Sequence, residues 1–167
     1  MHLSILAILS SVLLMAHAQN DAPSPKPPGL TFLYSLNCTL GTALPVGNGP
    51  HGTRLVIPIT GGTFKGPRIS GTVSNLGADW GLVDRSGTFS ADTRYHLQTD
   101  DGAQIFIRTS GPAQADGSLH LRLVFETGSE KYYWLNNIVA VGMLTTGCGG
   151  GCVLIDAWQV ESPAASI

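Results

Sequence analysis

After residue 30 the chain alternates apolar and polar side chains in short segments, with turn-forming residues between them. Such alternation is typical of half-buried strands, and no stretch keeps a helical period for as many as about ten residues. A spacing of roughly eight to twelve residues between turn signals is typical of sandwiches and barrels, and no longer repeat is visible. The sequence therefore predicts an all-β, single-domain fold. The expected strands are 31–40, 53–60, 62–65, 68–74, 79–84, 87–99, 103–110, 118–127, 131–136, 138–145 and 153–160.

The N-terminus has the pattern of a secretory signal peptide. An apolar run from Leu3 to Met15 precedes Ala16-His17-Ala18, which suits a cleavage site. The run is shorter than the roughly 20 residues that span a membrane. A buried N-terminal helix is the alternative, but the proline-rich residues 19–29 would have to connect it to the fold. We expect cleavage after Ala18 and a mature protein in the secretory pathway or outside the cell.

Cleavage would leave 149 residues (167 − 18), a length that suits one domain. We place this domain at 30–161, followed by a tail at 162–167. Charged residues are few, with 9 Lys and Arg against 11 Asp and Glu. The arginines are dispersed, so we expect no nucleic-acid partner, and without a second apolar run we expect no membrane span. A homodimer is left open.

Three cysteines follow the signal pattern: Cys38, Cys148 and Cys152. An oxidising compartment favours one bridge, and the pairings 38–148, 38–152 and 148–152 are all open. The alternation in "TFLYSLNCTL" directs Cys38 inward as a small apolar residue, while "CGGGC" is a tight loop. We therefore predict the bridge Cys148–Cys152. Outward-facing Asn37, in the sequon Asn37-Cys38-Thr39, is a candidate N-glycosylation site.

The hairpin around Asp100-Asp101-Gly102 can be registered from its pattern. A three-residue loop places apolar partners together on one face, whereas a two-residue loop would mix the two faces. The other face is polar and brings two arginines opposite each other, which repel unless a carboxylate or an anionic ligand bridges them. The alternative is two solvated arginines. The predicted pairs are Leu97–Ile105, Tyr95–Ile107, His96–Phe106, Gln98–Gln104 and Arg94–Arg108, and the candidate bridging carboxylates are Asp79, Asp92 and Glu126.

Several ordered motifs identify a family resemblance. The run "PITGGTFKGP", then "GADW", "ADTRYHLQTDDGAQIFIR", "FETG" and "YYWLN" resemble the family catalogued as domain of unknown function 3237, over about residues 29–160. The signal pattern and a shortened region between "IFIRTSG" and "FETG" depart from the bacterial form and suggest a fungal secretory branch. The resemblance implies a closed or nearly closed antiparallel β-barrel of the calycin or allene-oxide-cyclase type.

A barrel explains four glycines that lie close together in the sequence: Gly61, Gly62, Gly66 and Gly71. Strands bend and cross closely at barrel corners, and glycine allows this without a Cβ clash. We expect these glycines to be structural. A phosphate loop is excluded, because no Gly-Lys-Ser/Thr and no helix follow.

Asp79 is the first candidate acid, because apolar neighbours would raise its pKa; a turn-capping aspartate is the alternative. Trp80 and Trp134 are candidate pocket walls or barrel filling. If 131–136 is a strand, Trp134 and Asn136 share a face and Tyr133 points away. Asn136 is then a candidate ligand donor or a turn residue.

The sequence lacks the motifs of hydrolases, metalloproteases and dinucleotide enzymes, and the later histidines lie far apart. We predict no metal and no redox cofactor. The partner expected for a cofactor-free barrel is a small apolar or aromatic organic molecule, which the barrel could hold in a reactive conformation.

Two functions follow. The chain resembles proteins that join tropolone-derived quinone methides to sesquiterpenes by hetero-Diels–Alder cycloaddition in fungal secondary metabolism. That resemblance implies Asp79 or Glu126 as the acid, Arg94 or Arg108 on the tropolone oxygens, and aromatic residues on the terpene. The alternative is a secreted carrier barrel without turnover. The candidate substrate-binding residues are Trp80, Tyr133, Trp134 and Asn136.

Overall fold

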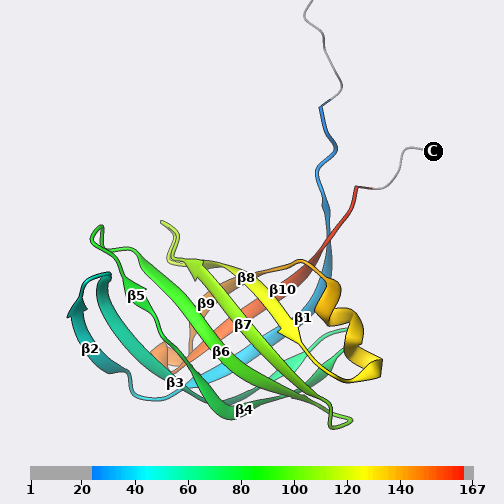
Figure 1. The fold of residues 1–167 in the computed structure, drawn as a ribbon, viewed down its shortest axis with the longest axis horizontal. Helices are drawn as coiled ribbons and strands as arrows, with labels where there is room; N and C mark the ends of the chain where they lie inside the picture. Colours follow the sequence, from blue (N-terminus) through cyan, green and yellow to red (C-terminus); the bar gives the residue numbers. More distant parts are fainter. Residues whose placement is uncertain (1–23, 164–167) are drawn as a thin grey trace, which may run out of the picture.

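The computed structural model describes residues 24–163 (Figure 1). The sequence predictions for 1–18, for the first part of 19–29 (19–23) and for 164–167 of the tail lie outside this range. Two short 3₁₀ helices accompany the strands: η1 (Glu130–Asn137) and η2 (Cys148–Gly150). The strands are β1 (Gly29–Leu40), β2 (Leu44–Gly49), β3 (Gly52–Lys65), β4 (Ser70–Asp79), β5 (Leu82–Val83), β6 (Phe89–Thr99), β7 (Gln104–Pro112), β8 (Leu119–Glu126), β9 (Ala140–Gly147) and β10 (Cys152–Glu161).

The sheet closes on itself. Hydrogen-bonded neighbours run in the order β1-β10-β9-β8-β7-β6-β4-β3, and β3 pairs again with β1. Every pairing is antiparallel. The two short strands lie beside this ring, with β2 on β3 and β5 between β3 and β6. The predicted all-β antiparallel barrel is confirmed, and closure leaves the ring without a free edge.

The register of the β6–β7 hairpin is the one that its sequence pattern predicts. Tyr95 pairs with Ile107 and Leu97 with Ile105, and these side chains are buried. The Thr99 amide donates to the Ala103 carbonyl and closes the three-residue loop. Because the barrel is closed, this apolar face is the inside and the polar face is the outer surface.

Strand β1 follows the predicted alternation except at one point. Tyr34, Leu36 and Cys38 are buried, while Asn37 is exposed. The pairing with β10 shifts between Phe32 and Tyr34, where a bulge changes the parity. Phe32, predicted to face inward, is therefore 38 % exposed.

The segment predicted as a strand at 131–136 is instead the 3₁₀ helix η1, and that prediction was wrong. Its two buried residues, Tyr132 and Leu135, are three positions apart. A 3₁₀ helix has three residues per turn, so both side chains lie on one face. This face packs across one end of the barrel, shown at the right of Figure 1, and closes it.

Asp101, in the β6–β7 loop, holds η1 in place. Its carboxylate accepts hydrogen bonds from Lys131 Nζ at 2.5 Å, Tyr132 Oη at 3.0 Å and Thr99 Oγ1 at 2.5 Å. The hydrogen bond from Lys131, followed by that from Thr99, lowers the pKa of Asp101 below its usual range. The loop and the closed end of the barrel are thereby joined.

Strand β2 was not expected from the sequence. Pro45 and Gly47 break the strand pattern, and the pairing with β3 shifts between them. Proline is tolerated because β2 is an edge strand that pairs with β3 alone. The two predicted strands 53–60 and 62–65 are one continuous strand, β3.

The predicted disulfide is present. Cys148 and Cys152 are bonded across the glycine-rich turn η2, and Cys38 is free and buried. The bridge joins the end of β9 to the start of β10.

We expect Cys148→Ser to lower the melting temperature. The bridge restrains the unfolded chain, and for so short a loop this restraint corresponds to about 2 kcal/mol of stability. Cys148→Ser loses this contribution because its unfolded chain is no longer cross-linked. Thermal unfolding with and without reductant measures this. Reduction should bring the wild-type protein to the level of Cys148→Ser and leave that variant unchanged; equal melting of oxidised wild type and variant would contradict the prediction.

Asn37 stays a predicted glycosylation site. Its side chain lies exposed on the outer face of β1, where a glycan would meet solvent rather than the core. We expect protein from a eukaryotic host to begin at Gln19 and to carry one glycan. Intact mass before and after glycosidase treatment checks both predictions, with Asn37→Gln as the control. A mass that glycosidase leaves unchanged would contradict the predicted glycan.

Within residues 24–163, no helix combines the length and the apolar character that a membrane crossing needs.

Candidate functional site

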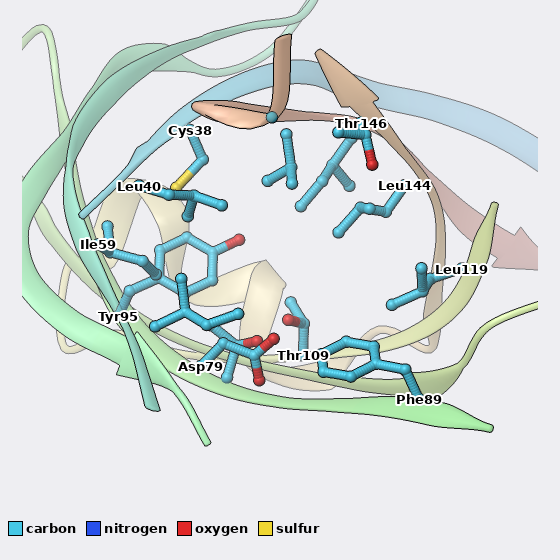
Figure 2. A pocket seen from close by; sticks show the side chains of 15 residues that line it. Cys38, Leu40, Ile59, Asp79, Phe89, Tyr95, Thr109, Leu119, Leu144 and Thr146 are labelled. Carbon is cyan, nitrogen blue, oxygen red and sulfur yellow. The ribbon is translucent and has the colours of Figure 1, made fainter. Parts of the chain in front are cut away.

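The barrel interior is hollow at the end opposite η1. A cavity of about 250 Å³ lies there, between the ends of β1, β4, β7 and β9 and the starts of β6, β8 and β10 (Figure 2). Most of its wall surface is apolar, and Gly150 of η2 also lines it. Apolar wall residues include Leu40, Ile57, Ile59, Leu119, Leu144 and Val153.

A small set of polar groups interrupts this wall. The Cys38 thiol faces the cavity from β1, and the other polar side chains that line it are Asp79, Thr93, Tyr95, Thr109 and Thr146. Burial raises the pKa of Cys38 to about 12, so the thiol stays protonated. Few convergent polar groups in an apolar cavity are typical of a small-molecule site.

Asp79 ends β4 and sits opposite Thr93 of β6. Its Oδ1 accepts a hydrogen bond of 2.9 Å from the Asp92 amide. Desolvation by burial raises the pKa of Asp79, and a smaller contribution from the Asp92 charge acts in the same direction. Hydrogen bonds from the Asp92 amide and the Thr93 hydroxyl oppose the shift without reversing it. Asp79 can therefore hold a proton at a higher pH than an exposed aspartate and donate it inside the cavity.

Tyr95 is 2 % exposed, and its hydroxyl points into the cavity (Figure 2). Its Oη is buried and finds no hydrogen-bond partner among residues 24–163. Burial, with the neighbouring Tyr34 and Cys38, raises the pKa of Tyr95 well above its ordinary value. The phenol is thus a permanent donor that the protein itself does not satisfy.

The predicted arginine pair lies on the outer surface. Arg94 and Arg108 are opposite each other, as expected, and Asp92 bridges them at 3.3 Å from Arg94 Nη1 and 3.9 Å from Arg108 Nε. Arg94 also lies over the Trp80 ring, 5.6 Å from its centroid. Neither arginine nor Trp80 lines the cavity.

We therefore expect Arg94→Met and Arg108→Met to leave turnover within about threefold of the wild type. Both pairs with Asp92 are partly exposed, so each loss should destabilise the fold by less than about 1 kcal/mol. Turnover and thermal unfolding of each variant measure this. A loss of activity without a loss of stability would show that the ligand reaches the outer face, as the sequence had suggested.

The other predicted site residues lie near the closed end. Glu126, Tyr133 and Asn136 border a shallow outer hollow beside His96. Asn136 is engaged within the fold: its Oδ1 accepts from the Thr127 amide at 2.8 Å, and its Nδ2 donates to the Thr127 carbonyl at 2.9 Å.

Trp134 packs against the core from η1 and lies under the Arg68 guanidinium at 3.7 Å. The expectation that Trp134 and Asn136 share a strand face fails, because η1 is a helix.

Asp79 is thus the predicted site residue that the structure places in the cavity. Sequence reasoning missed Tyr95, Thr93 and Thr109. The hairpin register had already assigned Tyr95 to the apolar face, but no pattern shows whether that face is packed or borders a cavity. Among residues 24–163 no group of three or more His, Cys, Asp or Glu is placed to hold a metal ion.

Fold and site together define an antiparallel β-barrel that buries an acid in an apolar internal cavity. The chain belongs to the family described as "Protein of unknown function (DUF3237)", which it matches over residues 28–160.

The hydroalkoxylation enzyme phnH of Penicillium herquei is 36 % identical over 143 residues, covering 82 % of this chain and 87 % of that protein. A solved enzyme structure from Penicillium herquei, 36 % identical, has a TM-score of 0.69 over 82 % of this chain and 97 % of that one. A β-barrel-like protein from Acinetobacter baumannii, also 36 % identical, has a TM-score of 0.77 over 83 % and 99 %.

Proposed function

We propose that this protein is a cofactor-independent enzyme of fungal secondary metabolism that closes a cyclic ether by adding a hydroxyl group across a carbon–carbon double bond. One observation carries the proposal: the Asp79 carboxyl, with a raised pKa, faces an apolar cavity. The name of the Penicillium herquei relative, a hydroalkoxylation enzyme, supports the same reaction class. The proposal includes a location in the secretory pathway, which the signal pattern at Leu3–Met15 supports.

The reaction balances with Asp79 alone. The protonated carboxyl gives its proton to one alkene carbon, and the substrate hydroxyl oxygen bonds to the other carbon. The hydroxyl proton then returns to the Asp79 carboxylate, so substrate and product are isomers. Proton transfer by a positioned acid contributes typically 10² to 10⁴ in rate. The aliphatic wall adds to this by holding the hydroxyl close to the alkene.

Cavity size favours one small substrate. A volume of about 250 Å³ lies just below the roughly 300–1,000 Å³ usual for drug-sized ligands. An intramolecular cyclisation fits this space better than the coupling of two molecules, one of them a sesquiterpene. The hetero-Diels–Alder coupling of a tropolone-derived quinone methide to a terpene is therefore the second candidate. It too forms a carbon–oxygen bond without a cofactor, and Asp79 would assist the dehydration that precedes it.

Two probe substrates of similar size test the proposal. 2-Prenylphenol should cyclise to 2,2-dimethylchroman, or 1-(2-hydroxyphenyl)but-2-en-1-one to 2-methylchroman-4-one, faster than in buffer. The chromanone should form with an excess of one enantiomer, because the cavity is chiral. Binding of both probes without acceleration of either would support the carrier function instead.

A further inference from the structure

Tyr95 places a phenol in the cavity in addition to the carboxyl of Asp79. The carboxyl of Asp79 and the phenol of Tyr95 are both directed into it from neighbouring strands, β4 and β6 (Figure 2). Asp79 already receives the Asp92 amide, whereas the Tyr95 hydroxyl has no partner within the described chain. A buried donor left unsatisfied costs about 1–3 kcal/mol, so a group that accepts its hydrogen bond recovers this free energy.

Acceptors for Tyr95 are scarce around it. Ile107 is its partner on β7, and Gly77 is its partner on β4. The ionisable groups that help to raise its pKa, Tyr34 and Cys38, stay protonated because burial raises their pKa values, and neither accepts a hydrogen bond from Tyr95 within residues 24–163. Tyr34 Oη likewise has no hydrogen-bond partner in the described part of the chain. A molecule held in the cavity can therefore supply the acceptor that residues 24–163 do not.

We propose that the substrate is a conjugated carbonyl compound whose carbonyl oxygen accepts a hydrogen bond from Tyr95 Oη while its alkene lies beside Asp79. This inference rests on the proposed function and names its substrate class. The aliphatic wall suits the rest of a small, largely apolar molecule.

This arrangement directs the addition. The substrate hydroxyl oxygen bonds to the β-carbon, the double-bond electrons move towards the carbonyl oxygen, and Tyr95 stabilises the enolate charge that develops there. Asp79 gives its proton to the α-carbon, and its carboxylate takes the proton of the attacking hydroxyl. The product is an isomeric cyclic ether ketone, and no other reactant is needed.

A matched pair of unreactive probes isolates the Tyr95 hydrogen bond. Chroman-4-one carries the carbonyl and chroman does not, while their rings are otherwise alike. By calorimetric titration, the wild type should bind chroman-4-one about three- to tenfold more tightly than chroman, as one net hydrogen bond provides. Tyr95→Phe should remove this preference. Tyr34→Phe is the control, because it deletes an equally buried phenol that does not line the cavity.

Equal binding of the two probes, no binding of either, or a preference that survives in Tyr95→Phe would overturn the proposal. If Tyr95→Phe does not fold, the carbonyl stretching band of chroman-4-one bound to the wild type decides. A shift below its position in an apolar solvent is expected, and an unshifted band would overturn the proposal.

The two proposals fail separately. A ketone preference without cyclisation of either probe substrate keeps the substrate class and removes the enzymatic function. Cyclisation of 2-prenylphenol without a ketone preference keeps the enzymatic function and removes the proposed substrate class.

Discussion

Asp79→Asn is expected to lower turnover of the probe substrates by a factor on the order of 10² to 10⁴, the usual contribution of a positioned acid. Asparagine keeps the shape of the side chain and can still accept the Asp92 amide hydrogen bond, but it has no proton of comparable acidity. The fold should be at least as stable as the wild type, because the buried carboxyl no longer has to be desolvated in its charged form.

The pH dependence follows from the direction of the Asp79 pKa shift. The folded pKa is raised, so the protonated, donating form persists above the ordinary value of about 3.9 and is lost as the pH rises through the raised pKa. Turnover should fall over that interval. Stability should also decline between the unfolded and the folded pKa, because the unfolded chain loses its proton first.

Rate–pH profiles and thermal unfolding of both proteins measure these effects. Asp84→Asn is the control: this carboxylate caps an exposed turn through the amides of Ser86 and Thr88, so its loss should leave turnover unchanged. Wild-type turnover in Asp79→Asn would show that Asp79 is not the catalytic acid.

Gly62→Ala is expected to abolish folding or to destabilise the protein by roughly 4 kcal/mol, from backbone strain together with overpacking. Gly62 has φ +140, and a Cβ there would lie 2.1 Å from the Asn37 carbonyl oxygen. That oxygen belongs to the backbone of β1, at the seam where β3 and β1 close the barrel. The clash cannot be relieved without opening the ring.

Two further glycines separate these causes. Gly117 has φ +83, but an added Cβ there would meet no atom within 4 Å. Gly117→Ala therefore measures backbone strain alone. Gly128→Ala is unobstructed and has no positive φ, so it should be neutral. Denaturant unfolding of the three variants gives the comparison, and a Gly62→Ala variant no less stable than Gly117→Ala would contradict the close approach.

The same crowding explains two other glycines that the sequence predicted to be structural, Gly66 and Gly71. An added Cβ would lie 1.7 Å from the Leu33 oxygen at Gly66 and 2.0 Å from the Gln98 oxygen at Gly71. The interpretation of these residues as barrel-forming is confirmed. It was available from the sequence because glycine within a strand pattern already indicates a bend or a close crossing.

Local pattern also predicted the β6–β7 register, because a shift of one residue would have placed Leu97 or Ile105 in water. It could not predict η1. The alternation of aromatic residues in "YYWLN" fits a strand, and only the need to cover the barrel end decides for a 3₁₀ turn that buries Tyr132 and Leu135.

The site was harder to predict than the fold. The sequence offered the polar, arginine-bearing face as a candidate ligand face and left open a bridging carboxylate or two solvated arginines. Closure turns that face towards solvent, Asp92 bridges the arginines, and the cavity lies on the apolar face. Asp79 was found because its apolar neighbours are adjacent in sequence. Tyr95 was not, since its isolation depends on residues from β1, β4 and β7 that only the folded chain brings together.

The pairing of Gly29 with Glu161 determines how the barrel can be attached to other structures. The start of β1 and the end of β10 leave side by side (Figure 1), while the cavity opens where β1 ends and β10 begins. A fusion partner, a surface anchor or an immobilising tag joined at either terminus would therefore hold the protein with its mouth directed away from the attachment point. An attached partner would then not cover the cavity end, so the barrel is suited to being displayed on a support or joined to another protein.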